Sequence, residues 1–155
     1  MTHVGSIITK IFVRVKAVIS NDFNIQALRD KYGAHGDTIV RVDVFEDRAR
    51  TRKVYSAQYK VTDEGIKEVD PHEEPNAISQ TDYQTILNLI KGTRTWDYQG
   101  RKYVENYNYI RAFAEGRITV TKVKDLDGYL ADMGLFEELY QSILPKLNDT
   151  IGKYL

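Results

Sequence analysis

The chain has 155 residues, of which 42% are hydrophobic and 28% are charged, and its 22 basic side chains balance 22 acidic ones. The zero net charge argues against nucleic acid as a dedicated partner, because such affinity comes largely from excess basic charge. The sequence contains no cysteine, which excludes disulfides, thiolate nucleophiles and cysteine-ligated zinc. We therefore expect a cytoplasmic protein with one domain over residues 1–155, which can hold a core without a metal or other cofactor.

The N-terminal segment, residues 6–32, is expected to be helical. Between residues 6 and 20 the apolar side chains recur at three- and four-residue steps, which favours an amphipathic helix. Many of them are β-branched, so a strand is the alternative. Asn24 can cap a second helix over Ile25–Tyr32 that ends at Gly33. Basic residues interrupt the first apolar stretch, which is not typical of a signal peptide.

The middle of the chain has the pattern of a sheet. Residues 38–45 alternate between a face of valines and a mixed face, and Arg52–Val61 alternates again after a charged turn. Ile66–Val69 follows another turn and forms a short third strand. This pattern predicts an antiparallel hairpin with a third strand beside it, apolar on one face and wet on the other.

A capped helix follows the sheet strands. Ala77–Ser79 is expected to be a fourth strand. Thr81 is the predicted N-cap of the next helix, because Gln84 lies three residues later at the spacing of a capping box. A basic residue and Gly92 then end the helix, since glycine readily adopts the left-handed conformation at this position.

The C-terminal half is predicted to be mostly helical. Thr93–Gly100 is expected to be a turn, Lys102–Glu115 a second amphipathic helix, and Arg117–Val123 a strand. A helix over residues 126–148 ends the domain, and a glycine and a proline within it are expected to kink or divide it. Strands and helices are segregated along the chain, so the predicted fold class is α+β.

Residues 76–123 contain a series of short motifs. They are a strand of the type NAISQ, an acidic and aromatic helix start, two helix ends at glycine, and a Gly-basic-apolar strand. Their positions are Asn76–Gln80, Thr81–Tyr83, Leu89–Gly92, Ala112–Gly116 and Gly116–Val120. In this order the motifs resemble the sterol carrier protein 2 family of lipid-transfer domains, and with the preceding strands the resemblance covers residues 38–144.

The resemblance implies a mixed, largely antiparallel sheet of five strands covered by helices. It also implies an apolar tunnel that binds fatty acyl chains, sterols or similar ligands, and it supplies no catalytic residue. Two features depart from the family. The Gly-Asp that often follows the last strand is replaced by Lys122–Asp125, and Thr93–Tyr109 is unusually rich in tyrosine.

The leading functional hypothesis is therefore an apolar cavity that binds a hydrophobic or amphipathic small molecule or lipid. Polar tips of tyrosines would orient the ligand, and packing in a filled core is the alternative for each side chain. The predicted lining comes from the two central helices and the C-terminal one, and consists of Ile86, Leu89, Ile90, Tyr103, Tyr107, Ile110, Phe113, Phe136, Leu139 and Tyr140.

Two charged segments offer weaker candidates. Asp70–Glu74 contains one histidine and three carboxylates that could hold a divalent ion, but a solvated loop is the preferred interpretation and no metal is expected. The basic turn at residues 48–53 could touch an anionic membrane transiently, but a solvated hairpin tip is preferred.

Two other functions remain open. The first is a self-association module, a homodimer for instance, built on the aromatic segment Trp96–Tyr109 and the C-terminal helix. The second is an accessory domain of an enzyme with a small hydrophobic substrate. The chain lacks nucleophile elbows, phosphate loops and HExxH motifs, so we predict a non-enzymatic protein.

Overall fold

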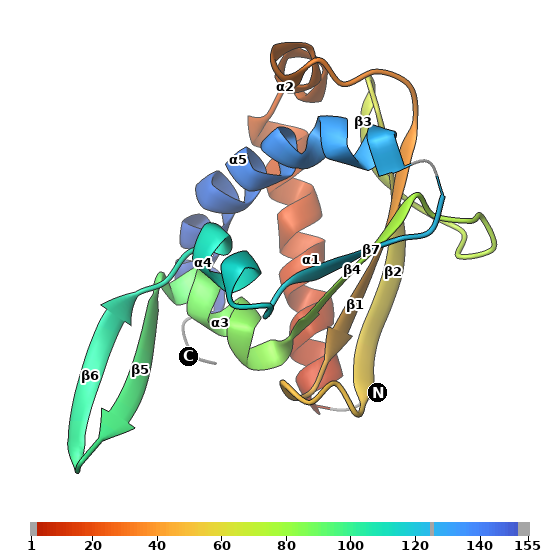
Figure 1. The fold of residues 1–155 in the computed structure, drawn as a ribbon. Helices are drawn as coiled ribbons and strands as arrows, with labels where there is room; N and C mark the ends of the chain where they lie inside the picture. Colours follow the sequence, from red (N-terminus) through yellow and green to blue (C-terminus); the bar gives the residue numbers. More distant parts are fainter. Residues whose placement is uncertain (1–2, 125, 152–155) are drawn as a thin grey trace.

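The computed structural model describes residues 3–124 and 126–151, and in it a five-stranded sheet carries helices against one face (Figure 1). A separate two-stranded hairpin projects from the helical layer on the side away from the sheet (Figure 1). The elements in chain order are α1 (His3–Asp22), α2 (Ile25–Tyr32), β1 (Thr38–Phe45), β2 (Lys53–Thr62), β3 (Gly65–Val69), β4 (Ala77–Asp82), α3 (Tyr83–Lys91), β5 (Thr93–Tyr98), β6 (Arg101–Asn106), α4 (Tyr109–Ala114), β7 (Thr119–Lys122) and α5 (Leu126–Ile151).

The main sheet has the strand order β3-β2-β1-β4-β7. β1 and β4 are parallel, and the other neighbouring pairs are antiparallel. The last strand, β7, returns late in the chain to lie beside β4. The α+β fold class with a mixed, largely antiparallel sheet of five strands is confirmed.

The two faces of this sheet differ in chemistry. Valines of β1 are buried under the helices, and Val44 is fully buried. On the other face Asp43 is also buried, which by itself opposes ionisation. Hydrogen bonds from Ser56, Arg41 and Gln80 outweigh that effect and lower the pKa of Asp43. The predicted apolar and polar faces are therefore present, but the polar face is not wet throughout, because Asp43 and Gln58 on it are buried.

The N-terminal segment is helical, as predicted. α1 buries an apolar stripe that includes Ile8 and Ile11, and its Phe12 ring stacks on Tyr55 of β2 at 4.6 Å between centroids. The Asn24 side chain caps α2 by accepting a hydrogen bond from the Ala27 backbone N–H at 3.0 Å. Its end at a left-handed glycine is also confirmed.

The start of α3 differs from the sequence prediction. The N-cap is Asp82, whose carboxylate accepts hydrogen bonds from the Thr85 backbone N–H at 3.0 Å and hydroxyl at 2.6 Å. β4 consequently extends to Asp82, and Thr81 stays within the strand. An aspartate satisfies the free amides at a helix start as well as threonine does, and it also complements the helix dipole. The predicted end at Gly92 is confirmed by its φ of 76°.

The largest error in the sequence prediction concerns Lys102–Glu115. Its first part is strand β6, which pairs with β5 in a hairpin, and only Tyr109–Ala114 is helical. Gln99 and Gly100 connect the strands with φ values of 50° and 76°, the positive values that a two-residue hairpin turn requires. The segment predicted as a turn, Thr93–Gly100, is therefore mostly strand.

The C-terminal helix α5 is one element that runs through both Gly134 and Pro145. A side chain at position 134 would collide with the ring of Tyr32 from α2, so this glycine permits the close contact between the two helices. Among the described residues, no helix is long and apolar enough to cross a membrane.

One arginine of the basic turn between β1 and β2 holds neighbouring strands together. Arg50 adopts a positive φ of 57° and reaches across the sheet edge. Its guanidinium donates to the Thr119 hydroxyl at 2.6 Å and to the Gln80 carbonyl at 3.3 Å, which ties the turn to β7 and β4. The next arginine, Arg52, pairs with Glu46. The turn is therefore less available to an anionic surface than its sequence suggests.

Candidate functional site

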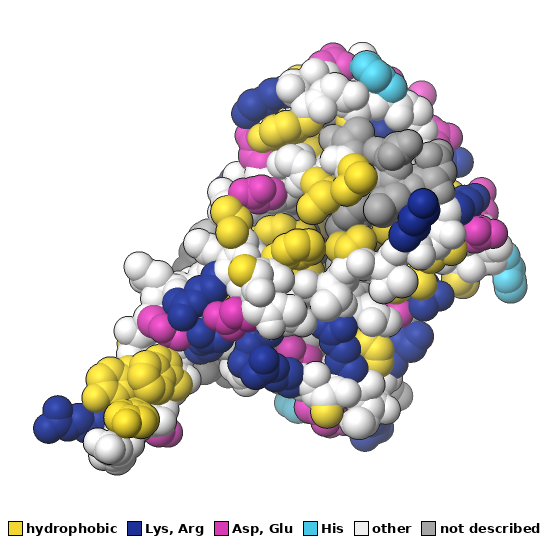
Figure 2. Space-filling model, in the orientation of Figure 1, with side chains coloured by type: hydrophobic (Ala, Val, Ile, Leu, Met, Phe, Trp, Pro, Cys, Tyr) yellow, Lys and Arg dark blue, Asp and Glu magenta, His cyan; other side chains and the backbone are white. Residues whose placement is uncertain are grey.

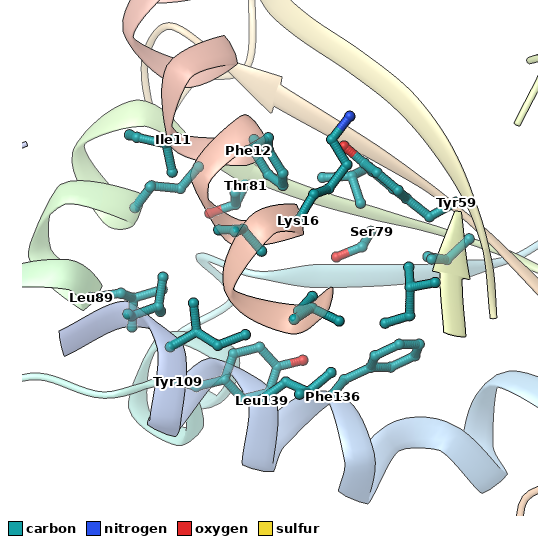
Figure 3. Close-up of a pocket in the computed structure, with 18 of the residues that line it drawn as sticks. Ile11, Phe12, Lys16, Tyr59, Ser79, Thr81, Leu89, Tyr109, Phe136 and Leu139 are labelled. Carbon is teal, nitrogen blue, oxygen red and sulfur yellow. The ribbon is translucent and has the colours of Figure 1, made fainter. Parts of the chain in front are cut away.

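An apolar cavity lies between the inner face of the sheet and helices α1, α3 and α5 (Figure 3). The strands contribute alternate side chains and the helices contribute the residues on their sheet-facing stripes. The cavity is lined by Ile11, Phe12, Val15, Lys16, Ile19, Val40, Val42, Tyr59, Val61, Ile66, Ser79, Thr81, Ile86, Leu89, Tyr109, Ile118, Phe136, Leu139, Ile143 and Leu144.

The lining is almost entirely hydrophobic. The only charged residue in it, Lys16, directs its amine to Glu68 at 3.3 Å, and the Tyr59 hydroxyl is hydrogen-bonded to the Tyr55 hydroxyl. The volume of the cavity is about 130 Å³. An apolar cavity of about 150 Å³ holds a benzene molecule, whereas ligand pockets usually measure about 300–1,000 Å³. A ligand larger than one ring must therefore displace side chains as it enters.

One face of the molecule shows hydrophobic side chains between β7 and α5, next to α4 (Figure 2). Exposed apolar residues of the flanking helices are Ile110 and Phe113 of α4, at 54% and 40% exposure, and Leu130 of α5, at 51%. We call these three residues the apolar rim.

The sequence placed ten residues in the cavity lining, and the structure brings four of them together there. These four are Ile86 and Leu89 of α3 with Phe136 and Leu139 of α5. Ile90 is buried but is not a lining residue. The α3 and α5 stripes thus contribute to the cavity through only part of their apolar surface.

Four further predicted residues lie elsewhere. Tyr103 belongs to strand β6 and not to the predicted helix. Its ring stacks on that of Trp96, with 4.7 Å between the ring centroids. Ile110 and Phe113 are exposed because α4 is one short helix that covers only part of the predicted stripe. Tyr107 is buried under the Arg94 guanidinium, 4.8 Å from its ring centroid. The side chain of Tyr140 lies outside the described residues.

The sequence did not identify the contributions of α1 and the sheet to the cavity. α1 supplies five lining residues, all between Ile11 and Ile19. The sequence did indicate the two apolar faces concerned, namely the apolar stripe of α1 and the alternating valines of β1. Which part of an apolar face borders a void depends on how distant elements pack, and no local pattern encodes that.

One polar atom in the cavity wall has no partner. The Thr81 hydroxyl is buried and makes no hydrogen bond within the described part of the chain. Thr81 was predicted to cap α3, a role that Asp82 performs instead. The hydroxyl is thereby left facing an apolar cavity, where an unpaired polar group is unfavourable.

A second, polar cleft of about 640 Å³ lies where α3, α4 and the hairpin meet. Arg94 forms ion pairs with both Glu105 and Glu115, and Arg111 forms ion pairs with the same two carboxylates. Arg117 lies 3.5 Å from Glu115. These arginines and glutamates form ion pairs mainly with one another. We therefore interpret them as a structural network that holds the base of the hairpin in place.

This network predicts a pH dependence. Hydrogen bonds from Arg94 first, and then from Arg111, hold the pKa of Glu115 at about 2, below its ordinary 4.5. Because the folded-state pKa is the lower one, this stabilisation is complete above about pH 4.5 and is lost as the pH falls towards 2. The unfolding temperature of the wild type should fall more steeply across this window than that of Glu115→Gln, as followed by circular dichroism. Glu64→Gln, at an exposed turn, is the control and should track the wild type, whereas parallel curves for Glu115→Gln would contradict the assignment.

The acidic loop does not gather a metal site in the described part of the chain. Asp70 and His72 lie 3.7 Å apart, and the His72 side chain is 92% exposed. No group of three or more potential ligands comes together among the residues that the structure describes.

No protein-family model matches the chain, and no curated protein matches its sequence. Solved structures do match in fold. Sterol carrier protein 2 from Yarrowia lipolytica, in its apo form, is 11% identical with a TM-score of 0.45, covering 87% of this chain and 90% of that one. The sterol carrier protein domain 2 of Helicoverpa armigera is 13% identical with a TM-score of 0.45, covering 87% and 88%.

A larger protein also matches. The MycE methyltransferase of the mycinamycin biosynthetic pathway is 11% identical with a TM-score of 0.48, and the match covers 99% of this chain but 35% of that one. Several of the similar solved structures are sterol carrier protein 2 proteins or domains, with TM-scores of 0.44 to 0.45.

Proposed function

We propose that the protein binds and carries a hydrophobic or amphipathic small molecule in the cavity between the sheet and helices α1, α3 and α5. The observation that supports this function is the apolar lining itself, which surrounds space that the side chains leave unfilled. Apolar surface transferred from water into such a site gains about 25 cal/mol per Å². A single acyl chain or ring system is the kind of ligand that this chemistry favours.

Transient contact with a membrane surface is part of this proposal. The apolar rim flanks the side where hydrophobic side chains are visible from solvent, and it would let a poorly soluble ligand pass between bilayer and cavity (Figure 2). Co-sedimentation with neutral phosphatidylcholine vesicles, compared between the wild type and Phe113→Asp, measures this contact.

Native mass spectrometry of the gently purified protein tests the carrier function. A co-purifying mass that organic extraction removes, together with recovery of binding by the extracted protein, is the expected result. Extracted protein should also bind a neutral apolar dye such as N-phenyl-1-naphthylamine, whose fluorescence rises in apolar surroundings. Protein that carries no added mass and binds no dye would argue against the function.

Self-association is the second candidate function, and the hairpin of β5 and β6 supports it. Trp96, Tyr98 and Tyr103 gather on one face of the hairpin and are 38–56% exposed, and Val104 on the other face is 67% exposed (Figure 2). Both strands of this two-stranded sheet are also edge strands, which readily pair with other chains. A second copy of the chain would cover such a surface in a homodimer.

The same mass spectra report the oligomeric state. If the hairpin mediates a dimer, Trp96→Ser should shift the protein to the monomer while leaving dye binding unchanged. Val13→Ser is a matched control, since Val13 is 57% exposed on α1, away from the hairpin. A monomeric wild type at micromolar concentration would exclude this second function.

A further inference from the structure

The inner face of β4 places hydroxyl groups in an apolar wall. β4 pairs in parallel with β1 so that Ser79 lies opposite Val42 and Thr81 lies opposite Val44. Because side chains alternate along a strand, both hydroxyl residues share the face of the buried valines. Both are lining residues of the cavity (Figure 3).

Thr81 has a buried hydroxyl that a ligand could hydrogen-bond. It is 9% exposed, and its hydroxyl has no hydrogen-bond partner within the described residues. Buried polar groups in proteins are almost always hydrogen-bonded, so an unpaired hydroxyl in a cavity wall needs a partner from outside the protein. Neighbouring Asp82 does not supply one, because its carboxylate is engaged by Thr85.

The surroundings of the cavity disfavour a charged head group. Lys16 is the one cationic lining residue, and its amine is paired with Glu68 outside the apolar wall. A carboxylate beside Thr81 would therefore be buried without a counter-ion, which is strongly unfavourable. It would also approach the buried carboxyl group of Asp82. A hydroxyl, ester or ketone oxygen avoids both penalties and can hydrogen-bond to Thr81.

We propose that Thr81 anchors an uncharged polar group of the ligand, so that the cavity selects neutral amphipathic molecules, such as long-chain alcohols or esters, over carboxylates of the same length. This inference rests on the proposed carrier function and narrows it to a class of ligand. The apolar part of the ligand lies against α1 and α5, and one oxygen meets the Thr81 hydroxyl on β4.

Competition between two ligands of equal length tests this selectivity. The neutral dye N-phenyl-1-naphthylamine is displaced from the wild type by 1-decanol or by decanoate at about pH 8, where decanoate is ionised. Decanol is expected to bind about tenfold more tightly than decanoate. Thr81→Val removes the hydroxyl with little change of shape and should weaken decanol about tenfold, the equivalent of one hydrogen bond, while Thr81→Ser retains it. Decanoate affinity should be similar in all three proteins.

Thermal unfolding without ligand gives a second readout. Thr81→Val should be at least as stable as the wild type, since it replaces an unpaired buried hydroxyl by a methyl group. A clear loss of stability would mean that the protein itself satisfies the hydroxyl, and it would overturn the proposal.

The outcomes separate this inference from the carrier function. Equal displacement by decanol and decanoate, or unchanged decanol affinity in Thr81→Val, overturns the anchor and leaves the carrier function standing. Failure of the wild type to bind the dye or either competitor overturns both.

Discussion

Replacing Asp132 by alanine is expected to lower the free energy of unfolding by about 3–5 kcal/mol, the usual cost of leaving a buried charge without its partner. Asp132 of α5 and Arg29 of α2 are both fully buried. The guanidinium donates to the two carboxylate oxygens at 3.0 and 3.2 Å. Chemical denaturation followed by circular dichroism measures the change.

Two controls make this prediction specific. Arg29 also pairs with Asp63, whose side chain is 56% exposed, and Asp63→Ala should cost about 1 kcal/mol or less because that partner is solvated. The double substitution Arg29→Met with Asp132→Leu should recover most of the stability, since apolar side chains replace buried ion pairs well. If Asp132→Ala lowered the free energy of unfolding by less than about 1 kcal/mol, the Arg29 guanidinium would have found other partners, and the prediction would be wrong.

The ion pair also bears on the cavity. It fastens α2 to α5 close to Gly134, where the ring of Tyr32 packs directly on the helix backbone. α5 supplies Phe136 and Leu139 to the cavity wall just beyond this point. The position of that wall therefore depends on contacts made by α2, which itself contributes no lining residue.

Local signals explain the parts of the fold that the sequence predicted correctly. Asn24 and Gly33 delimit α2 through a side-chain cap and a left-handed glycine, both of which depend only on neighbouring backbone groups. The alternation of β1 and β2 depends on one buried face, which the valines report directly. Predictions of this kind hold because the interaction that decides the structure lies within a few residues.

The hairpin shows why other parts could not be predicted as securely. In Lys102–Glu115 apolar residues recur at three- and four-residue steps, which matches a helix, yet the segment up to Asn106 is a strand paired with β5. The feature that indicated a hairpin instead was Gln99-Gly100, a possible two-residue turn between segments rich in threonine and aromatic residues. Because the hairpin is solvated on both faces, it lacks the buried face that makes a strand recognisable.

The cavity is less predictable than the fold. The sequence identified apolar side chains, and four of its ten lining candidates do border the cavity. Whether such a residue meets another side chain or a void depends on the separation of α1, α3 and α5 from the sheet. Thr81 illustrates the limit, since either Thr81 or Asp82 could cap α3, and the choice decides whether a hydroxyl faces the cavity.

Filling the cavity should abolish most ligand binding. Val42 lies on the inner face of β1, opposite Ala57 and Ser79, two small neighbours that leave room for a larger side chain. We expect Val42→Phe to weaken dye binding at least tenfold, or about 1.4 kcal/mol, because the ring occupies the space that the ligand needs. Fluorescence titration with N-phenyl-1-naphthylamine measures the affinity.

The stability of Val42→Phe separates blocking from unfolding. Adding volume to a filled core costs about 1–3 kcal/mol, and the void of about 130 Å³ should reduce that cost. Ile110→Asp is the matched control, because Ile110 is 54% exposed on α4 and does not line the cavity, and this variant should bind the dye as the wild type does. A folded Val42→Phe with wild-type affinity would place the ligand elsewhere. Loss of affinity in Ile110→Asp alone would move the site to the apolar rim.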